Sequence, residues 1–384
     1  MVSSLAVTET QFAEQFRQFL NGTNDDLRVI RERAFRYFEE NGFPSVREEN
    51  WKYTNVAPIA KENWTLSPGA LTSSPAAGED VRGLFEQFNF ERNGFTALNA
   101  AFAQPVVYRI PKETSVAKPI EITFSADDGN VIFPHVIFIA EKGSKATLIE
   151  TYASTAKGFT NSAVQIIVED NASLTHFRVQ KDSPDAFNVG TTEVAVGRGG
   201  YYNATSINLG AAISRHDIDL KFTAEGGEAH VDGLYMLNGS QHADTHSVID
   251  HLVPNCASHQ NYKGVLNDRS RAVFNGIVFV REDAHGTDAQ QSNKNLLLSN
   301  EARVDTKPQL EIFNDDVKCS HGATVGQLEE EELFYLLTRG LPENLARNLL
   351  TYGFAEEIIN KIDIGSIKSD LDATVLNRLS AEII

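Results

Sequence analysis

The segment GSKATL at residues 143–148 begins a pattern that recurs through the middle of the chain. A turn-forming Gly, Asn or Asp comes first, then small residues, then a run of strand-forming side chains. The further copies are NASLTH at 171–176, GYYNAT at 200–205, GEAHV at 227–231, DRSRAV at 268–273 and NEARVD at 300–305. Their step is roughly 27–30 residues except for one longer gap before residue 268, which is typical of a stacked repeat protein. We therefore favour a β-helix, with a β-sandwich as the alternative that also fits regular strands and turns.

Helical patterns lie on both sides of this β-rich region. Phe12, Phe16 and Leu20 share one face of a predicted helix near the start, and Leu333 and Leu337 belong to another after the repeats. The chain is thus predicted to be mainly β. It divides into an N-terminal helical domain at 1–100, a parallel β-helix core at 101–325 and a C-terminal helical domain at 326–384.

Charge and composition exclude several classes of function. The chain has 34 basic and 52 acidic residues, a net charge of −18, which repels nucleic-acid phosphate and anionic lipid. No apolar run approaches the ~18 residues that span a bilayer, and Met1–Val7 lacks the features of a signal peptide. The chain has only two cysteines, which cannot form a disulfide framework, so we expect a cytoplasmic protein. No GxxxxGK[ST] segment occurs, so the chain is not expected to hydrolyse ATP itself.

Cys319 and His321 are the first candidate site. Residues two apart on a strand point to one face, so a thiolate and an imidazole would project together. Such a pair suits a soft metal or a nucleophile–base couple. Spacing alone favours the alternative, a buried structural cysteine beside an ordinary histidine. Two ligands are also too few for a closed metal site, so any others must come from elsewhere in the chain or from another chain.

His242, Asp244 and His246 form the second candidate. On a strand they share one face and could hold iron or zinc. The favoured alternative is a polar, solvated face of the β body. Cys256 lies close by in sequence and could join this cluster, although a core thiol is favoured. Trp51 is expected to anchor the N-terminal region to the rest of the chain.

Several longer motifs together resemble the SufB/SufD family of the SUF iron–sulfur cluster assembly machinery. They are DVKCSHGAT at 316–324, LFYL at 333–336 with RG at 339–340, REENWKYT at 47–54, RAVFNG at 271–276, NLLLS at 295–299 and DTKPQLEI at 305–312. The resemblance covers nearly the whole chain. Its KCSH segment and the modest chain length favour the SufD branch over the paralogue SufB.

The resemblance implies a right-handed parallel β-helix flanked by the two helical domains. It implies a non-catalytic scaffold subunit that pairs with SufB through the last β-helix strands, or with a second copy of itself in isolation. Cys319 and His321 match the residues placed at that interface, where a transient iron–sulfur cluster shared with SufB forms. The C-terminal helices, through Leu333, Phe334 and Leu337, would dock the SufC ABC-type ATPase. A role in iron acquisition and a reduced flavin in the complex are further implications.

Two other functions remain as alternatives. One is a β-helix enzyme that acts on polysaccharide, although the acidic charge opposes acidic sugars and no clear pair of catalytic carboxylates stands out. The other is a His-rich metal-binding protein that uses His242, Asp244 and His246.

Overall fold

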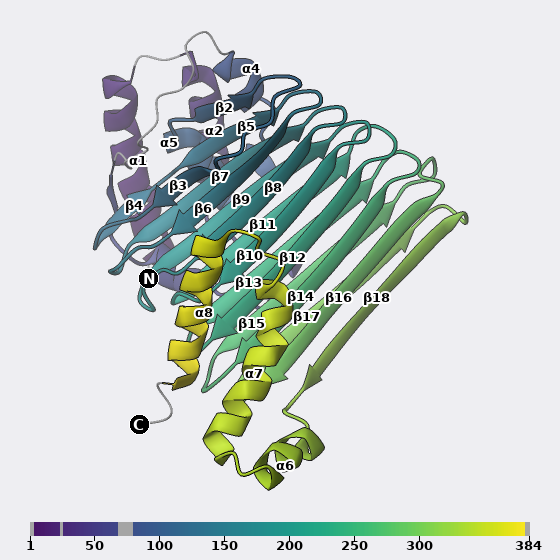
Figure 1. The fold of residues 1–384 in the computed structure, drawn as a ribbon. Coiled ribbons are helices and arrows are strands. Elements are labelled where there is room, and N and C mark those ends of the chain that lie inside the picture. Colours follow the sequence, from purple (N-terminus) through teal and green to yellow (C-terminus); the bar gives the residue numbers. More distant parts are fainter. Residues whose placement is uncertain (1–3, 24–25, 68–79, 381–384) are drawn as a thin grey trace.

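The middle of the molecule is a parallel β-helix made of two sheets that face each other (Figure 1). The computed structural model describes residues 4–23, 26–67 and 80–380. Every strand pair in these ranges is parallel. The predicted β-helix is confirmed, and the β-sandwich alternative is wrong, because from β5 to β18 sequential strands alternate between the sheets.

The two sheets have ten and eight strands. Sheet A contains β1 (Thr65–Leu66), β2 (Val106–Ile110), β4 (Asn130–Ile132), β5 (His135–Ala140), β7 (Phe159–Val168), β9 (Phe187–Val196), β11 (Ile213–Phe222), β13 (His242–His251), β15 (Arg271–Val280) and β17 (Arg303–Ile312). Sheet B contains β3 (Ile120–Phe124), β6 (Lys145–Tyr152), β8 (Ser173–Gln180), β10 (Tyr201–Asn208), β12 (Glu228–Leu237), β14 (Ala257–Leu266), β16 (Thr287–Leu297) and β18 (Val317–Gly326).

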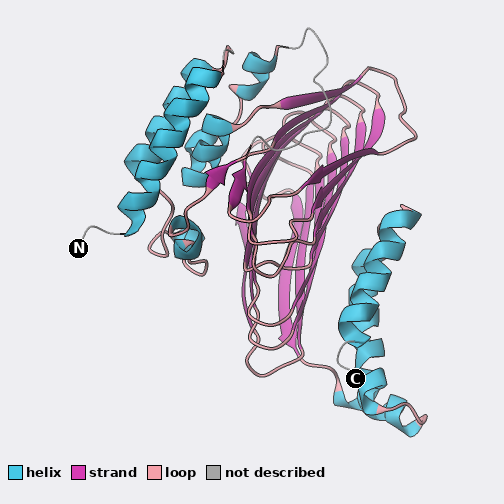
Figure 2. Cartoon of the chain, turned by 90° about the vertical axis from the view of Figure 1, so that its left-hand side faces the viewer, coloured by secondary structure: helices cyan, strands magenta, loops and turns pink. Residues whose placement is uncertain are grey.

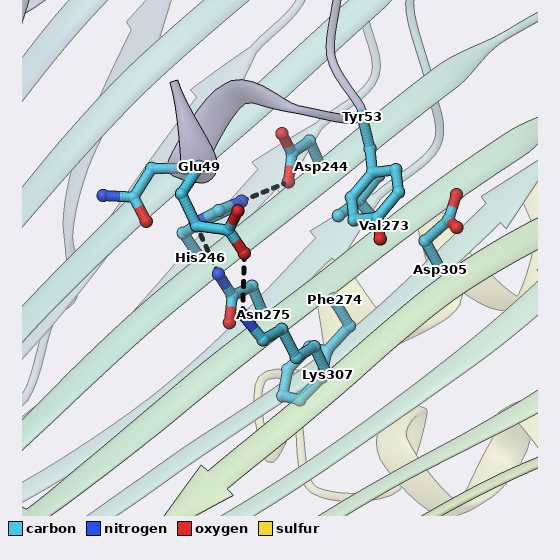
Figure 3. Close-up of a pocket in the computed structure, with 10 residues that line it drawn as sticks. Glu49, Tyr53, Asp244, His246, Val273, Phe274, Asn275, Asp305 and Lys307 are labelled. Atoms are coloured by element: carbon cyan, nitrogen blue, oxygen red, sulfur yellow. Dashed lines mark hydrogen bonds and ion pairs between the residues drawn. The ribbon is translucent and has the colours of Figure 1, made fainter. Parts of the chain in front are cut away.

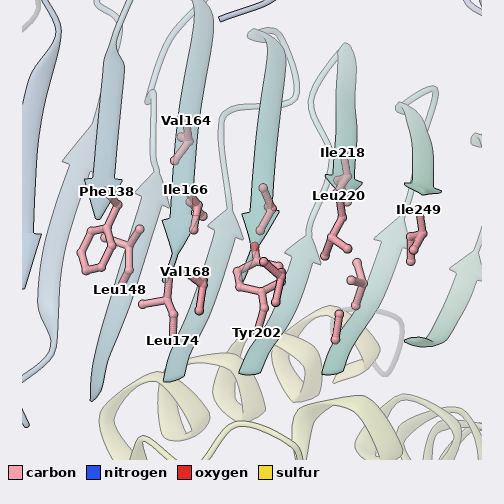
Figure 4. Packing of buried hydrophobic residues seen from close by; sticks show 14 of the residues in the cluster. Phe138, Leu148, Val164, Ile166, Val168, Leu174, Tyr202, Ile218, Leu220 and Ile249 are labelled. Atoms are coloured by element: carbon pink, nitrogen blue, oxygen red, sulfur yellow. The ribbon is translucent and has the colours of Figure 1, made fainter. Parts of the chain in front are cut away.

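Apolar side chains from both sheets fill the space between them, which we call the lumen (Figure 4). Branched residues such as Ile166, Leu174 and Leu220 belong to this core. The core continues through successive turns of the β-helix, which we call rungs, each with one strand of sheet A and the following strand of sheet B. Because side chains alternate along a strand, every second residue of each strand enters the lumen and the others face outward.

Left-handed turns explain the sequence repeat. Gly143, Asn171, Gly199, Gly226, Asn255 and Gly286 have φ between 57° and 75°, a region that favours Gly and Asn. The backbone N–H of each donates to a carbonyl of the following turn, so the turns stack along one edge where the chain enters sheet B. Asp268, with φ 52°, belongs to the opposite edge, where the chain enters sheet A. The longer gap in the repeat therefore marks a change from one edge to the other, and the first series continues through Asn255.

N-terminal helices cover the outer face of sheet A (Figure 2). Phe12, Phe35 and Phe102 pack there with Phe133, which lies between β4 and β5, and with Phe159 of β7. The elements are α1 (Ser4–Gly22), α2 (Arg28–Asn41), η1 (Glu49–Trp51), α3 (Ala57–Ala60), α4 (Val81–Phe85), η2 (Phe90–Arg92) and α5 (Gly94–Phe102). The sequence places enough aromatic residues in this region to build a second core.

C-terminal helices cover the outer face of sheet B on the other side of the β-helix (Figure 2). Ile358 of α7 (Glu343–Ile359) and Val375 of α8 (Gly365–Ser380) pack with Phe177 and Met236 of the sheet. By contrast, α6 (Glu330–Thr338) has no buried residue. Three glutamates in its first turn suit the helix dipole.

Candidate functional site

The last rung of the β-helix, β17 and β18, has two free edges. Each strand is the last of its sheet, and neither has a partner on its outer side among the strands that the structure describes (Figure 1). The burial pattern of both strands contains no buried residue. Ile312, Phe313 and Val325 are 41%, 55% and 49% exposed. An edge of this kind presents unpaired backbone N–H and C=O groups and apolar side chains to another chain.

Cys319 and His321 lie on β18, at this open end. Cys319 is half-buried and packs against the core between the sheets, so its side chain points into the lumen. Strand alternation directs His321 inward as well, and this side chain is exposed because no further rung covers it. In the register of β16 and β18, Cys319 lies opposite Ala289 and His321 lies opposite Gln291. The two side chains therefore stand together at the mouth of the lumen.

The Cys319 thiol is not an activated nucleophile by itself. Burial raises its pKa, the backbone N–H of Ala289 lowers it, and the Asp288 carboxylate raises it again, with a net rise. A thiol with a raised pKa carries its proton at neutral pH and reacts slowly. A metal ion that binds this sulfur must displace the proton, so metal binding here would release protons.

His242, Asp244 and His246 face outward from β13, where the N-terminal region covers them. Figure 3 shows Asp244 and His246 beneath the segment of Glu49 and Tyr53. Their shared face agrees with strand spacing, but the face is not solvated. The Thr54 hydroxyl donates to Asp244 Oδ2 at 2.5 Å and lies 2.8 Å from His242 Nε2. His246 Nε2 is 3.1 Å from Asp244 Oδ1. The favoured expectation of exposed histidines is wrong for His242 and His246, because both are largely covered by other parts of the chain.

Asp244 is held by a buried arginine. Arg215 Nη1 donates to Asp244 Oδ2 at 2.7 Å, and Arg215 Nη2 donates to Asp217 Oδ1 at 2.8 Å. Burial opposes ionisation of Asp244, but Arg215 and the neighbouring histidines hold its pKa well below the usual range. Burial also lowers the pKa of His242. The trio thus serves a charge network, and the described residues contain no group of three or more His, Cys, Asp or Glu side chains arranged to hold a metal ion.

Trp51 connects this network to the N-terminal core. Its ring is 3% exposed, lies 3.7 Å from the Arg215 guanidinium carbon and stacks on Phe95. Lys307 of β17 also bonds Glu49 at 2.9 Å, so the same segment reaches the last rung (Figure 3). The anchoring role predicted for Trp51 is confirmed. Cys256 is 1% exposed within the lumen core, which confirms the core-thiol interpretation.

Sequence reasoning missed the polar groups inside the β-helix. His176 Nε2 lies 2.7 Å from Glu150 Oε1, and Tyr152 donates to Glu150 Oε2 at 2.6 Å. Gln291 and Gln260 form a second interior pair, with 2.6 Å between Nε2 of Gln291 and Oε1 of Gln260. Polar residues that recur at one position of successive repeats could have indicated these interior groups, but the recurrence can be recognised only when the strand register is known.

The C-terminal helices carry an exposed apolar surface. Phe334 and Leu337 of α6 are 68% and 37% exposed, and Leu333 is half-buried. Leu345 and Leu349 of the following helix, α7, are also exposed, at 41% and 47%. The side chains to which the family resemblance assigns ATPase docking thus lie mostly open to solvent. Among the described helices, none has the length and apolar character to cross a membrane.

Two family models match this chain, and several known proteins are similar to it over most of its length. The SufBD core domain of the SUF system for FeS cluster assembly matches residues 122–354, and the SufBD protein N-terminal region matches residues 9–82. The iron–sulfur cluster assembly protein SufD of Escherichia coli is 30% identical over 88% of this chain and 90% of its own length. SufD of Bacillus subtilis is 26% identical over 86% of this chain and 77% of its own.

A SufBD family protein of Synechocystis is 38% identical, with 72% of this chain and 64% of that protein aligned. The core match contains both the last rung and the strands beneath it, and the N-terminal match contains the Trp51 segment. The chain therefore belongs to the SufBD family of iron–sulfur cluster assembly proteins.

Proposed function

We propose that this protein is a SufD-like, non-catalytic subunit of a cluster assembly complex, and that Cys319 and His321 supply its half of an intersubunit cluster site. The observation that carries the proposal is their position together at the open end of the β-helix, beside two unpaired strand edges. Two donors leave a metal site incomplete, and a partner chain at these edges could bring the missing ligands. The cluster is a product assembled and released, so its binding is transient.

Single variants of the two donors test this role. Cys319→Ala and His321→Ala should each reduce cluster formation by roughly 10-fold or more when the complex with SufB and SufC is reconstituted without oxygen. Cluster formation is followed by absorption and by iron and sulfide content. Ser320→Ala is the matched control, because its side chain lies on the same strand and points to the other face. Normal assembly in both donor variants would exclude the assigned role.

The free edges support pairing with SufB, or with a second copy of this chain. A second β-helix can extend both sheets through β17 and β18, since edge strands recruit strands of another chain. Val325→Asp places a charge at the exposed end of β18 and should weaken association. Val29→Asp is the control, because Val29 is 58% exposed on α2, away from the open end. Sedimentation velocity with and without SufB measures the effect, and unchanged association would argue against this interface.

The apolar surface of α6 and α7 supports docking of the SufC ATPase. Phe334→Asp and Leu337→Asp should abolish co-purification with SufC, whereas Val29→Asp should not. Retained co-purification in both variants would place the docking site elsewhere. Iron supply and flavin association belong to the assembled complex, and iron and flavin analysis of the co-purified complex tests both.

The two alternative functions have less support. A polysaccharide-active β-helix needs an open groove along its strands, but helices cover much of both outer faces. A His-rich metal store needs available histidines, but Thr54 contacts His242 and Asp244. Arg215 pairs with Asp244, and His246 lies 3.1 Å from the same carboxylate.

A further inference from the structure

A chain of amide side chains runs inside the β-helix toward His321. Gln260 Nε2 donates to Ser247 Oγ at 2.9 Å, and Gln291 Nε2 donates to Gln260 Oε1 at 2.6 Å. Gln260 and Gln291 are register partners on adjacent strands, and His321 is the next partner in the same column. The hydrogen bonds therefore join two successive rungs, and His321 of the last rung is next in line at the open end of the lumen.

The direction of this chain leaves one acceptor at its outer end. Gln291 donates away from the open end, and Gln260, one rung below, accepts that hydrogen bond. Gln291 is 3% exposed, and its Oε1 is buried without a hydrogen-bond partner among the described residues. A buried carbonyl oxygen that lacks a partner loses free energy relative to water, so such atoms usually have a donor within reach. The imidazole N–H of His321, one rung above, is a donor of the right kind.

The site for Gln291 is built by the fold. Gly276 lies across the lumen, and a Cβ at that position would stand 2.3 Å from Gln291 Nε2. Glycine at 276 thus leaves the space that the amide occupies. Ala289, the neighbour of Cys319 in the register, is small and fully buried, so it offers Cys319 no side-chain hydrogen-bond partner.

We propose that Gln291 is a positioning residue: its Oε1 accepts a hydrogen bond from one ring nitrogen of His321 and so directs the other nitrogen toward the intersubunit site. A histidine that binds a metal commonly donates its second N–H to an acceptor, which selects the tautomer and the ring orientation. The hydrogen bonds to Gln260 and from Gln260 to Ser247 hold this amide in place from the rung below. The inference rests on the proposed role of His321 as a ligand.

The tautomer of His321 tests the inference without any cluster. The full-length protein is labelled with ¹⁵N in histidine, and long-range ¹H–¹⁵N spectra are recorded at mildly alkaline pH, with His321→Gln used for assignment. Wild type should show one tautomer of His321. Gln291→Met, which is similar in size but lacks the acceptor, should show the averaged signals of two tautomers. Gln291→Glu, which keeps an acceptor, should restore a single tautomer, and Gln290→Leu, on the outward face of the same strand, should match wild type.

Two results would overturn the inference. One is averaged signals for His321 in the wild type, and the other is a single tautomer that persists in folded Gln291→Met. Thermal melts establish that each variant is folded. If Gln291→Met does not fold, the comparison of wild type with Gln291→Glu still tests the inference. In the reconstituted complex, Gln291→Met should lower cluster formation by roughly 10-fold.

The inference and the proposed function fail separately. Normal assembly in His321→Ala would refute the ligand role even if the wild-type tautomer is single. Loss of assembly in His321→Ala, with an unchanged tautomer in Gln291→Met, would refute only the positioning role.

Discussion

The early rungs and the last rung of the β-helix share a backbone plan but differ in what covers them. All six residues of β5 are buried, whereas β17 and β18 have no buried residue. Strand pairing and turn geometry continue unchanged from one to the other. The difference is that helices and neighbouring rungs cover β5, while the last rung has an open side. Burial of a strand in this fold thus depends more on the elements that stack on it than on its own repeat sequence. A rung that nothing covers is available to a partner chain.

Two phenylalanines measure this difference most directly. Phe138 of β5 is 0% exposed, and Phe313 after β17 is 55% exposed. Phe138→Ala should lower the free energy of unfolding by about 3–5 kcal/mol, because it leaves a cavity in the core. Phe313→Ala should change it by about 0.5 kcal/mol or less. Urea unfolding of the isolated protein checks both values, and equal losses would mean that the last rung is covered in solution, for example by a second copy.

Charged pairs extend the comparison. Arg215 is buried between Asp217 and Asp244, whereas the pair of Lys307 and Glu49 at the last rung is exposed. Arg215→Met should destabilise the protein by about 3–5 kcal/mol, since two buried carboxylates lose their cation. Lys307→Met should have an effect of at most about 1 kcal/mol. Thermal and urea melts provide the measurement, and a small effect at Arg215 would show that water replaces the guanidinium.

A buried histidine should make stability depend on pH. His251 lies in the lumen, Ser258 Oγ is 2.8 Å from its Nε2, and burial lowers its pKa from 6.5 to about 4. Between these values the unfolded chain binds a proton that the folded chain does not, so stability falls as pH falls through this window. The loss from this group is on the order of 3 kcal/mol.

Urea melts at a series of pH values measure the slope, and His251→Gln should make it smaller. Because other buried histidines act in the same direction, the slope should not vanish in this variant. A slope unchanged by the substitution would mean that His251 takes up its proton in the folded state near its usual pKa.

Glycines give the smallest contrast. A Cβ at Gly233 would lie 2.2 Å from the Tyr262 ring, whereas a Cβ at Gly322 of β18 would meet nothing within 4 Å. Gly233→Ala should therefore destabilise by about 1–3 kcal/mol, and Gly322→Ala should be neutral within about 0.5 kcal/mol. The difference in melting temperature between the two variants is the test. A large loss in Gly322→Ala would indicate close packing at the free edge.

The fold was largely accessible from the sequence because turn chemistry is local. A left-handed turn needs Gly, Asn or Asp at a defined position, and that requirement recurs at every rung. The sequence pattern alone groups Asp268 with the other turns, although it belongs to the opposite edge, because a local pattern does not reveal which sheet follows a turn. The aromatic N-terminal region and the acidic start of α6 were also visible as local patterns.

The candidate sites show what local sequence patterns can and cannot predict. That Cys319 and His321 share a face, and that His242, Asp244 and His246 share another, follows from a strand period of two. Thr54 covers the second group from a position about 190 residues earlier in the chain, and no spacing rule reaches that far.

The sequence by itself favoured the β-helix over a sandwich and determined the flanking helices, the family motifs and the pairing of a thiol with an imidazole. Each of these depends on neighbours within a few residues or on a repeated turn. Only the tertiary structure decided that this pair faces the lumen at an unpaired edge and that the histidines of β13 lie beneath the N-terminal segment. Strand register also decided that Gln291 stands beneath His321. These outcomes depend on which distant residues cover or stack on a strand, and that is set by packing of the whole chain.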